Sequence, residues 1–408
     1  MKKPVLALCA LAAVGTAAAQ SSVTLFGVVD AGISHYSTKS RSFGSTLPRQ
    51  VTQSQTVLSP SGNASSRIGF RGTEDLGGGL AASFWLEAPL ANDAGGGIGN
   101  FGRRSTVSLS GPFGELRLGR DYTASFWNDA VFDPFSVNGV GTNLIAVVNS
   151  NIAAARALAT GGLLNGGLSA GTDSYLRTSN AVSYFLPPTL GGFYGQVQYA
   201  LHENVDVSDV AGSPSKRGRY AGGRLGWSNG KADVSLAYGE STLVSTTLGG
   251  EKIKSMNLGG SYDFGMVKVF GEWSRVRDAR NGTTLFATQL TDRYNGLMGG
   301  VNVPVGPGTI RASFARVSFK NGNGLPDSDA SVNKLALGYV HNLSKRTALY
   351  ASVARIRITD GHNNPTIMGV TPLVVSLPSI APQPAFVSTR GFEPRSSLGY
   401  DFGIRHAF

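Results

Sequence analysis

Five arginines have the type and spacing to act on dissolved ions, and the chemistry they suit is the attraction of anions. Arg67, Arg71, Arg104, Arg117 and Arg177 occupy alternate positions in segments whose intervening positions are mostly apolar. A guanidinium group stays charged and presents a planar set of donors to carboxylates and phosphates. These side chains predict a water-filled surface whose positive potential concentrates anions. Each arginine could instead pair with a carboxylate on a neighbouring strand and fix the register.

Two carboxylates in a long polar connection complete the predicted site. Asp129 and Asp133 lie among aromatic residues in 126–135, within a connection, 122–176, that is far longer than usual. Aromatic side chains are poorly placed on an exposed tip, so we expect this third loop to fold inward and narrow a bore. Asp129 and Asp133 would then face the arginines and set a transverse field. The alternative is a mobile surface loop.

The sequence offers little for catalysis or metal binding. Its single cysteine, Cys9, lies within the first 19 residues. Thiolate chemistry and cysteine metal sites are therefore excluded from the rest of the chain. None of the five histidines lies beside a serine in a nucleophile motif. We therefore predict a protein that is not an enzyme and needs no cofactor and no metal. An outer-membrane hydrolase is the enzymatic alternative.

The first residues predict an export signal. Lys2 and Lys3 precede an apolar stretch at 5–14, and three alanines at 17–19 provide a cleavage site before Gln20. We expect a signal peptide at 1–19 and one domain at 20–408. The formal charge of +11 falls to +9 when the two lysines are removed. In an exported chain this basic balance favours anionic solutes or an anionic membrane surface as partners, and no nucleic acid.

Alternation of apolar with polar or small residues defines the elements that must position these side chains. Near the C-terminus, Leu398, Tyr400, Phe402 and Ile404 alternate with glycine, aspartate and glycine. Short turns and long polar connections also alternate along the chain, and they separate sixteen such segments. This predicts an all-β fold, a 16-stranded antiparallel transmembrane β-barrel with short periplasmic turns, long extracellular loops and an inward-folded third loop. A soluble β-sandwich is the alternative.

Several motifs, spread over the whole chain after the signal, resemble those of one protein family. They lie at 22–27, 66–77, 101–104, 116–120, 132–135 and 403–408. As a set they are similar to the trimeric general porins of β-proteobacteria, the Gram-negative outer-membrane porin family. The third loop is longer here than is usual in that family, through the alanine- and glycine-rich stretch 140–171.

The resemblance implies a homotrimer in the outer membrane that lets small hydrophilic solutes and ions diffuse passively, with a preference for anions. It implies that Arg67, Arg104 and Arg177 face Asp129 and Asp133 at the constriction. It also implies partners: outer-membrane lipid, lipopolysaccharide, small anionic or polar solutes and the barrel-assembly machinery. The assembly signal read by that machinery is expected at the C-terminal residues Tyr400, Phe402, Ile404 and Phe408.

Other barrel functions remain open from the sequence. One is a substrate-selective channel for phosphate or an organic acid, because the alternation of faces cannot locate side chains in the gap. Another is an adhesin barrel whose polar loops bind a host. A plugged, energy-coupled transporter is disfavoured because the first predicted strand begins at Val23, with no plug ahead of it.

Overall fold

A computed structural model describes most of the 408-residue chain. The described residues are 22–42, 49–96, 98–159, 175–203, 216, 218–246, 249–281, 290–324, 327–363 and 392–408. The expected signal peptide, 1–19, lies outside them. Among the described residues, no helix is both long and apolar enough to cross a membrane.

Seventeen strands and two α-helices make up the described structure. The strands of the first half are β1 (Ser22–Ser42), β2 (Gln50–Ser59), β3 (Arg67–Gly77), β4 (Leu80–Pro89), β5 (Arg104–Gly111), β6 (Gly114–Tyr122), β7 (Arg177–Phe185), β8 (Phe193–Ala200) and β9 (Tyr220–Ser228). Those of the second half are β10 (Ala232–Thr246), β11 (Gly249–Asp263), β12 (Lys268–Asn281), β13 (Leu290–Val305), β14 (Gly308–Lys320), β15 (Ala330–Asn342), β16 (Thr347–Thr359) and β17 (Phe392–Ala407). The helices, α2 (Ala124–Val131) and α3 (Leu144–Ala159), both belong to the third loop, and a 3-10 turn, η1 (Gly361–Asn363), follows β16.

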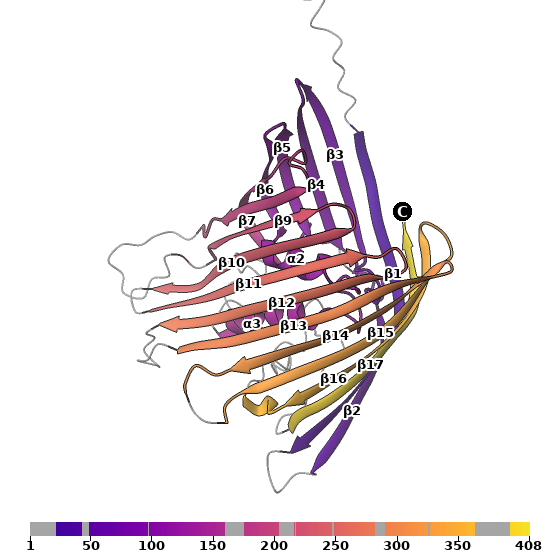
Figure 1. Cartoon of the computed structure of the whole chain (residues 1–408), viewed down its shortest axis with the longest axis vertical. Coiled ribbons are helices and arrows are strands. Elements are labelled where there is room, and N and C mark those ends of the chain that lie inside the picture. The colour runs from indigo at the N-terminus through magenta and orange to yellow at the C-terminus, as the bar shows by residue number, and fades with distance from the viewer. Residues whose placement is uncertain are drawn as a thin grey trace, which may run out of the picture.

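The strands form one closed antiparallel ring, which Figure 1 shows around the two helices. From β3 onward consecutive strands pair along the chain, and β1 closes the ring by pairing with β17 from Val28 to Ser42. On its other edge, β1 pairs with β3 from Ser22 to Val28 and with β2 from Gly32 to Arg41. Because β2 and β3 share one place in the ring, the seventeen strands build a sixteen-stranded barrel, as predicted.

The break between β2 and β3 is held by a buried carboxylate. Asp30 on β1 accepts hydrogen bonds from the backbone N–H groups of Gly62, Asn63 and Ala64 at 3.3, 3.0 and 2.8 Å. The hydroxyl of Tyr350 on β16 donates a further bond to Asp30, at 2.5 Å. A buried acceptor of this kind satisfies the N–H groups that leave the strand ladder, so the connection turns inward without losing its hydrogen bonds.

Side chains alternate between the two faces of the ring, as predicted. On β15, Leu335 and Leu337 are 61% and 53% exposed, whereas Lys334 and Ala336 between them are buried. The exposed apolar side chains are those expected on a lipid-facing surface. In the C-terminal strand, Tyr400, Phe402 and Ile404 are exposed in the same way.

The sequence pattern is misleading at two places. The polar residues of 36–63 predict a long first loop, yet β1 continues to Ser42 and β2 begins at Gln50. Polar strand residues continue the ladder there because backbone pairing does not require apolar side chains. The residues 152–159, flanked by glycine-rich sequence, predict a short helix, whereas α3 begins eight residues earlier, at Leu144. Its first two turns are apolar and pack on the barrel wall, a tertiary contact that the local sequence does not reveal.

Candidate functional site

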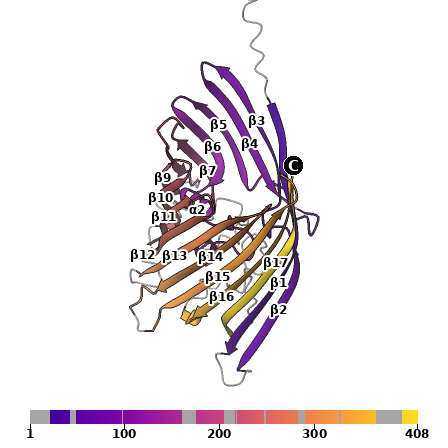
Figure 2. The ribbon, with the colours of Figure 1, turned by 45° about the vertical axis from the view of Figure 1, so that its right-hand side comes forward.

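The third loop folds into the barrel and lies against one side of its inner wall. After β6, Thr123 caps α2 by accepting a hydrogen bond from the backbone N–H of Phe126 at 3.3 Å. Helix α2 contacts β8, β9, β10 and β11, and α3 contacts β13 and β14. Figure 2, turned from the first view, also shows α2 inside the ring. The inward fold predicted for this loop is therefore present.

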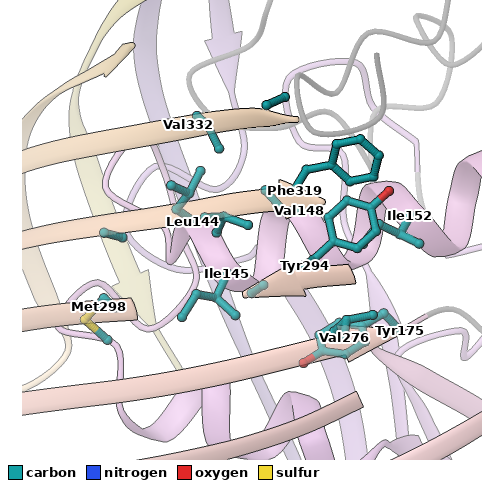
Figure 3. Close-up of a cluster of buried hydrophobic side chains, with 14 of the residues drawn as sticks. Leu144, Ile145, Val148, Ile152, Tyr175, Val276, Tyr294, Met298, Phe319 and Val332 are labelled. Carbon is teal, nitrogen blue, oxygen red and sulfur yellow. The ribbon is translucent and has the colours of Figure 1, made fainter. Parts of the chain in front are cut away.

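Helix α3 is fixed to the wall by apolar packing. Leu144, Ile145, Val148 and Ile152 are all at most 2% exposed. They belong to one buried cluster with inward side chains of β12–β16, several of which Figure 3 labels: Val276, Tyr294, Met298, Phe319 and Val332. Full burial of a large apolar side chain stabilises the docked helix by about 1.5–3 kcal/mol. This part of the inner wall is thus a hydrophobic core rather than a wetted pore lining.

At several inward-facing glycines, a side chain of the loop occupies the space that a larger residue would fill; we call these positions the glycine contacts. A Cβ at Gly259 would lie 2.1 Å from the ring of Phe132, and one at Gly300 would lie 2.4 Å from Pro134. Gly296 provides the same room for Ile145. Real side chains cannot approach so closely, so any larger residue at these places would push the loop off the wall. We call the surface of β10–β16 that carries the loop the loop-covered wall.

The structure corrects the expected role of Asp129 and Asp133. Both are buried, at 0% and 3% exposure, so they do not face the arginines across an open gap. Asp129 accepts hydrogen bonds from the hydroxyl of Tyr175 at 2.8 Å and from the side-chain amide of Asn257 at 2.6 Å. Asp133 accepts bonds from backbone N–H groups, including that of Asn143 at 3.0 Å. These carboxylates hold the loop in place, because a buried carboxylate must stay close to the groups that donate hydrogen bonds to it.

Burial also changes the acidity of these two loop carboxyls. Loss of water raises the pKa of Asp129 to about 6, although hydrogen bonds from Tyr175 and Asn257 oppose the rise. Burial likewise raises the pKa of Asp133, against the lowering effect of its three backbone N–H donors. Near Asp129, Glu272 of β12 accepts a hydrogen bond from Asn143 at 2.6 Å. The loop contact therefore contains several carboxyls within a short distance.

The opposite side of the bore, formed by β3–β7, carries the predicted arginines and is called the arginine wall. At its extracellular end, Glu87 pairs with Arg103 and lies 3.6 Å from the Nε of Arg67. The guanidinium of Arg177 lies 4.5 Å from the ring centre of Tyr122 and donates to its hydroxyl at 3.0 Å. Arg67 and Arg103 therefore share one carboxylate, and Arg177 lies against Tyr122.

A second group lies farther toward the short turns. Arg117 is ion-paired with Glu115 at 2.8 Å and with Asp121 at 2.6 Å. Arg104 lies 3.6 Å from Asp121. Arg117 is thus neutralised by two carboxylates of its own strand, rather than by one of a neighbouring strand as the alternative for these arginines supposed, whereas Arg104 has a longer contact with Asp121 across the strands.

Arg71 and Arg104 both lie against the ring of Trp85, at 5.2 and 4.5 Å from its centre. This cation–π contact orients both guanidinium planes. Together with Ser83 and Ser108 these residues line a pocket of about 260 Å³ on the inner face of β3, β4 and β5. Arg71 forms no ion pair with any carboxylate in the described part of the chain. The pocket thus exposes positive charge to the bore.

Sequence alternation missed some of these residues. Arg103 precedes β5, where alternation does not apply, but its double-arginine motif with Arg104 was visible. A change of register between Gly119 and Asp121, together with Asn180 at a φ of 55°, interrupts the alternation of β7. Such a bulge shifts the facing of later side chains. Alternation alone could therefore not place Arg177, which lies with the other arginines nonetheless.

The ring, its lipid-facing exterior and its charged inner wall define a transmembrane β-barrel channel. The Gram-negative porin family model matches residues 5–361, so the chain belongs to that family. It is 35% identical to outer membrane porin protein 32 of Delftia acidovorans over the full length of both chains. It is 29% identical to an outer membrane porin protein of Bordetella pertussis, covering 86% of this chain and 93% of that one.

The solved structures agree with this assignment. The anion-selective porin from Comamonas acidovorans matches with a TM-score of 0.67 and 31% identity, covering 95% of this chain and 100% of the other. The protein is therefore an outer-membrane porin, with its short turns on the periplasmic side and its long loops on the extracellular side.

Proposed function

We propose that this porin is a passive diffusion channel that prefers anions and does no enzymatic chemistry. The observation that carries the proposal is the arginine wall. Arg67, Arg71, Arg103, Arg104, Arg117 and Arg177 outnumber the three carboxylates that form ion pairs with arginines of this wall, which are Glu87, Glu115 and Asp121. A low-dielectric wall focuses the resulting positive potential into the bore. The similarity to a solved porin described as anion-selective supports the same conclusion.

The reversal potential across a planar bilayer tests the preference directly. With purified protein in a potassium chloride gradient, the sign of the potential should report chloride passing more readily than potassium. A cation-selective result would refute the charge argument while leaving the barrel intact. Absence of any conductance would instead favour a barrel that acts only as an adhesin.

A second candidate, a channel selective for phosphate or an organic acid, is favoured by the pocket beside Trp85. Two guanidinium groups and the hydroxyls of Ser83 and Ser108 could hold an oxyanion there. Saturation of the current as phosphate or succinate rises would support selectivity. A current that grows in proportion to concentration would support general diffusion.

The proposed assembly is a homotrimer. Strands β5–β9 have only eight or nine residues, whereas β10–β17 have 13 to 16. Nine tilted residues are at the lower limit for crossing the hydrocarbon layer. Contact of the short-stranded side with a second copy would shield its ends from lipid. The mass of the purified protein in detergent, measured by light scattering before and after heating, tests this.

The C-terminal residues are proposed to guide assembly. Tyr400, Phe402, Ile404 and Phe408 are exposed, at 43%, 51%, 45% and 41%, and form an aromatic and apolar edge that the barrel-assembly machinery could bind. The signal peptide at 1–19 is proposed to export the chain; N-terminal sequencing of the mature protein would locate the cleavage before or after Gln20.

A further inference from the structure

Strand β2 has one edge without a partner strand. In the described part of the chain it pairs with β1 alone, from Gln50 opposite Arg41 to Ser59 opposite Gly32. Figures 1 and 2 both show it beside β1, at the lower right of the molecule. Closure of a barrel removes the edges of a sheet, so a free edge of this length is an exception that calls for a role.

The pairing with β1 identifies the backbone groups that this edge presents. The backbone N–H of Ser42 donates to the carbonyl of Arg49 at 3.2 Å, so these two residues form a hydrogen-bonded pair. Such pairs alternate along an antiparallel ladder. The uniform register therefore turns away from β1 the N–H and C=O groups of every second residue of β2, namely Gln50, Thr52, Ser54, Thr56 and Leu58. All five residues are exposed, and their backbone groups have no hydrogen-bond partner in the described ranges.

The free edge lies on the extracellular side of the lipid-facing band. Leu58 and Ile33, which are opposite each other, are 52% and 41% exposed on the outer face. From Thr56 to Gln50 the same face of β2 carries only hydroxyl and amide side chains. An unpaired backbone edge is not tolerated in the hydrocarbon layer, whereas water solvates it beyond that layer. The edge is therefore accessible to another polypeptide.

Strand β2 lacks the features that protect edge strands from pairing with other chains. Its ten residues include no charged residue, no proline and no glycine, and its register with β1 contains no bulge. Natural edge strands are usually protected by lysine, proline or a bulge. The valines and threonines of β2 also favour the extended conformation. An incoming strand would thus meet a regular and uncharged template.

Cations beside the free edge indicate the chemistry of the partner. Lys39 and Arg41 of β1 and Arg49, which precedes β2, are exposed. None of the three forms an ion pair with a carboxylate in the described ranges. Glu393 is opposite Arg41 in the register, but it is buried and lies 3.6 Å from Arg395. An added strand would lie two strand spacings, about 10 Å, from β1, where its glutamate side chains could extend toward these cations.

We propose that the free edge of β2 binds an extended, acidic segment of another protein, which adds to the barrel wall as a further strand. Main-chain hydrogen bonds along the edge supply the affinity of such an addition, and side-chain contacts supply its specificity. The carboxylates of the partner face Lys39, Arg41 and Arg49. The proposal gives the channel a protein-binding surface; it needs only the extracellular position of β2 and is independent of anion preference.

A proline at the centre of the edge tests the proposal. In S54P the lost N–H points away from β1, so β2 should stay in the ladder, while the edge loses a donor and its new ring obstructs an incoming strand. The probe is a synthetic decapeptide of alternating glutamate and valine, titrated into purified protein in detergent. The wild type should bind it, and S54P should bind it at least about tenfold more weakly. S54A, which keeps the backbone N–H, is the control and should bind like the wild type.

Charge is varied in the same titration. K39Q/R41Q/R49Q should weaken binding of the peptide several-fold, whereas K231Q/K345Q/R346Q, which removes three exposed cations from the periplasmic turns, should not. A peptide with glutamine in place of glutamate should bind the wild type as weakly as the acidic peptide binds K39Q/R41Q/R49Q. Equal binding of the two peptides to the wild type would overturn the choice of an acidic partner.

The remaining outcomes concern the edge itself and its occupant. A reversal potential of S54P that matches the wild type shows that the barrel is intact, and equal binding of the acidic peptide to both proteins would then overturn the edge as the site. Light scattering of the proteins without peptide tests a second occupant. Wild-type assemblies larger than those of S54P would make another copy of this chain the partner and overturn the proposal of a foreign segment.

Discussion

The two walls of the bore differ in what their inward side chains do. On the arginine wall, charged residues face water and pair incompletely with Glu87, Glu115 and Asp121. On the loop-covered wall, inward residues such as Val332 and Ile356 are 0% and 1% exposed, and they belong to the same buried apolar cluster as residues of α3. One half of the ring therefore gives the channel its charge. The other half holds the third loop inside the ring, and this docking depends on apolar packing.

The largest expected effect is release of the third loop. V332D places a carboxylate in the apolar contact with α3, where an unpaired buried charge costs about 3–5 kcal/mol. The loop should leave the wall and the single-channel conductance should rise clearly. V332A, which keeps the contact apolar, should change the conductance little. An unchanged conductance for V332D would show that α3 does not narrow the bore.

Neutralising the arginine wall should abolish selectivity while keeping the pore size. In R67Q/R104Q/R177Q, Glu87 retains Arg103 and Asp121 retains Arg117 as partners, so the wall should stay folded. The anion preference should fall several-fold in reversal-potential measurements, because the excess positive charge is lost. R346Q in an exposed periplasmic turn is the control. Retained selectivity in the triple variant would mean that other residues set the preference.

Adding a methyl group at one of the glycine contacts should have a smaller effect on the docking of the third loop. G259A brings a methyl group to 2.1 Å from the ring of Phe132, and overpacking of this kind costs about 1–3 kcal/mol. The docked loop should become more accessible to protease, with a modest rise in conductance. G271A is the matched control, because no heavy atom lies within 4 Å of its added methyl group. Equal protease sensitivity in the two variants would show that the contact between Gly259 and Phe132 does not hold the loop.

The smallest effect concerns pH. The pKa of Asp129 rises from its ordinary value of 3.8 to about 6 on burial, so the docked loop binds more protons than a released loop between these values. Docking should therefore strengthen as pH falls through this window and weaken as it rises, by at most about tenfold for each pH unit. Hydrogen exchange of α2 amides, corrected for intrinsic rates, measures this. D129N should remove the dependence; the same dependence in D129N would assign it to another group.

Most of the ring could be predicted from the sequence, because lipid imposes a period of two on strands such as β17. The loop-covered wall could not. At the outer ends of β12–β16 the pattern is inverted: Arg277 and Arg357 are exposed on the outer face, while Val276 and Ile356 are buried inside. Alternation reveals two faces, but it does not reveal which face is covered when a loop supplies an apolar partner.

The candidate site was predicted in part for a related reason. Arg67, Arg104 and Arg177 lie on one side of the bore as expected, because strand position fixes them. Asp129 and Asp133 lie in a loop whose side chains are oriented by partners more than a hundred residues away, such as Asn257 for Asp129. Charge type alone suggested a pore-facing role. The donors that bury these carboxyls become apparent only when the ring is closed.

The glycine contacts also constrain the order in which the strands and the third loop take their places. Ile145 and Phe132 find their places on β13 and β11, which are made long after the third loop. Until those strands have been inserted, the apolar side chains of α3 have no wall to cover them, and such exposed surface favours aggregation. The third loop can therefore dock only after β11 and β13 are in place, so the interior of the barrel takes its final shape late in folding.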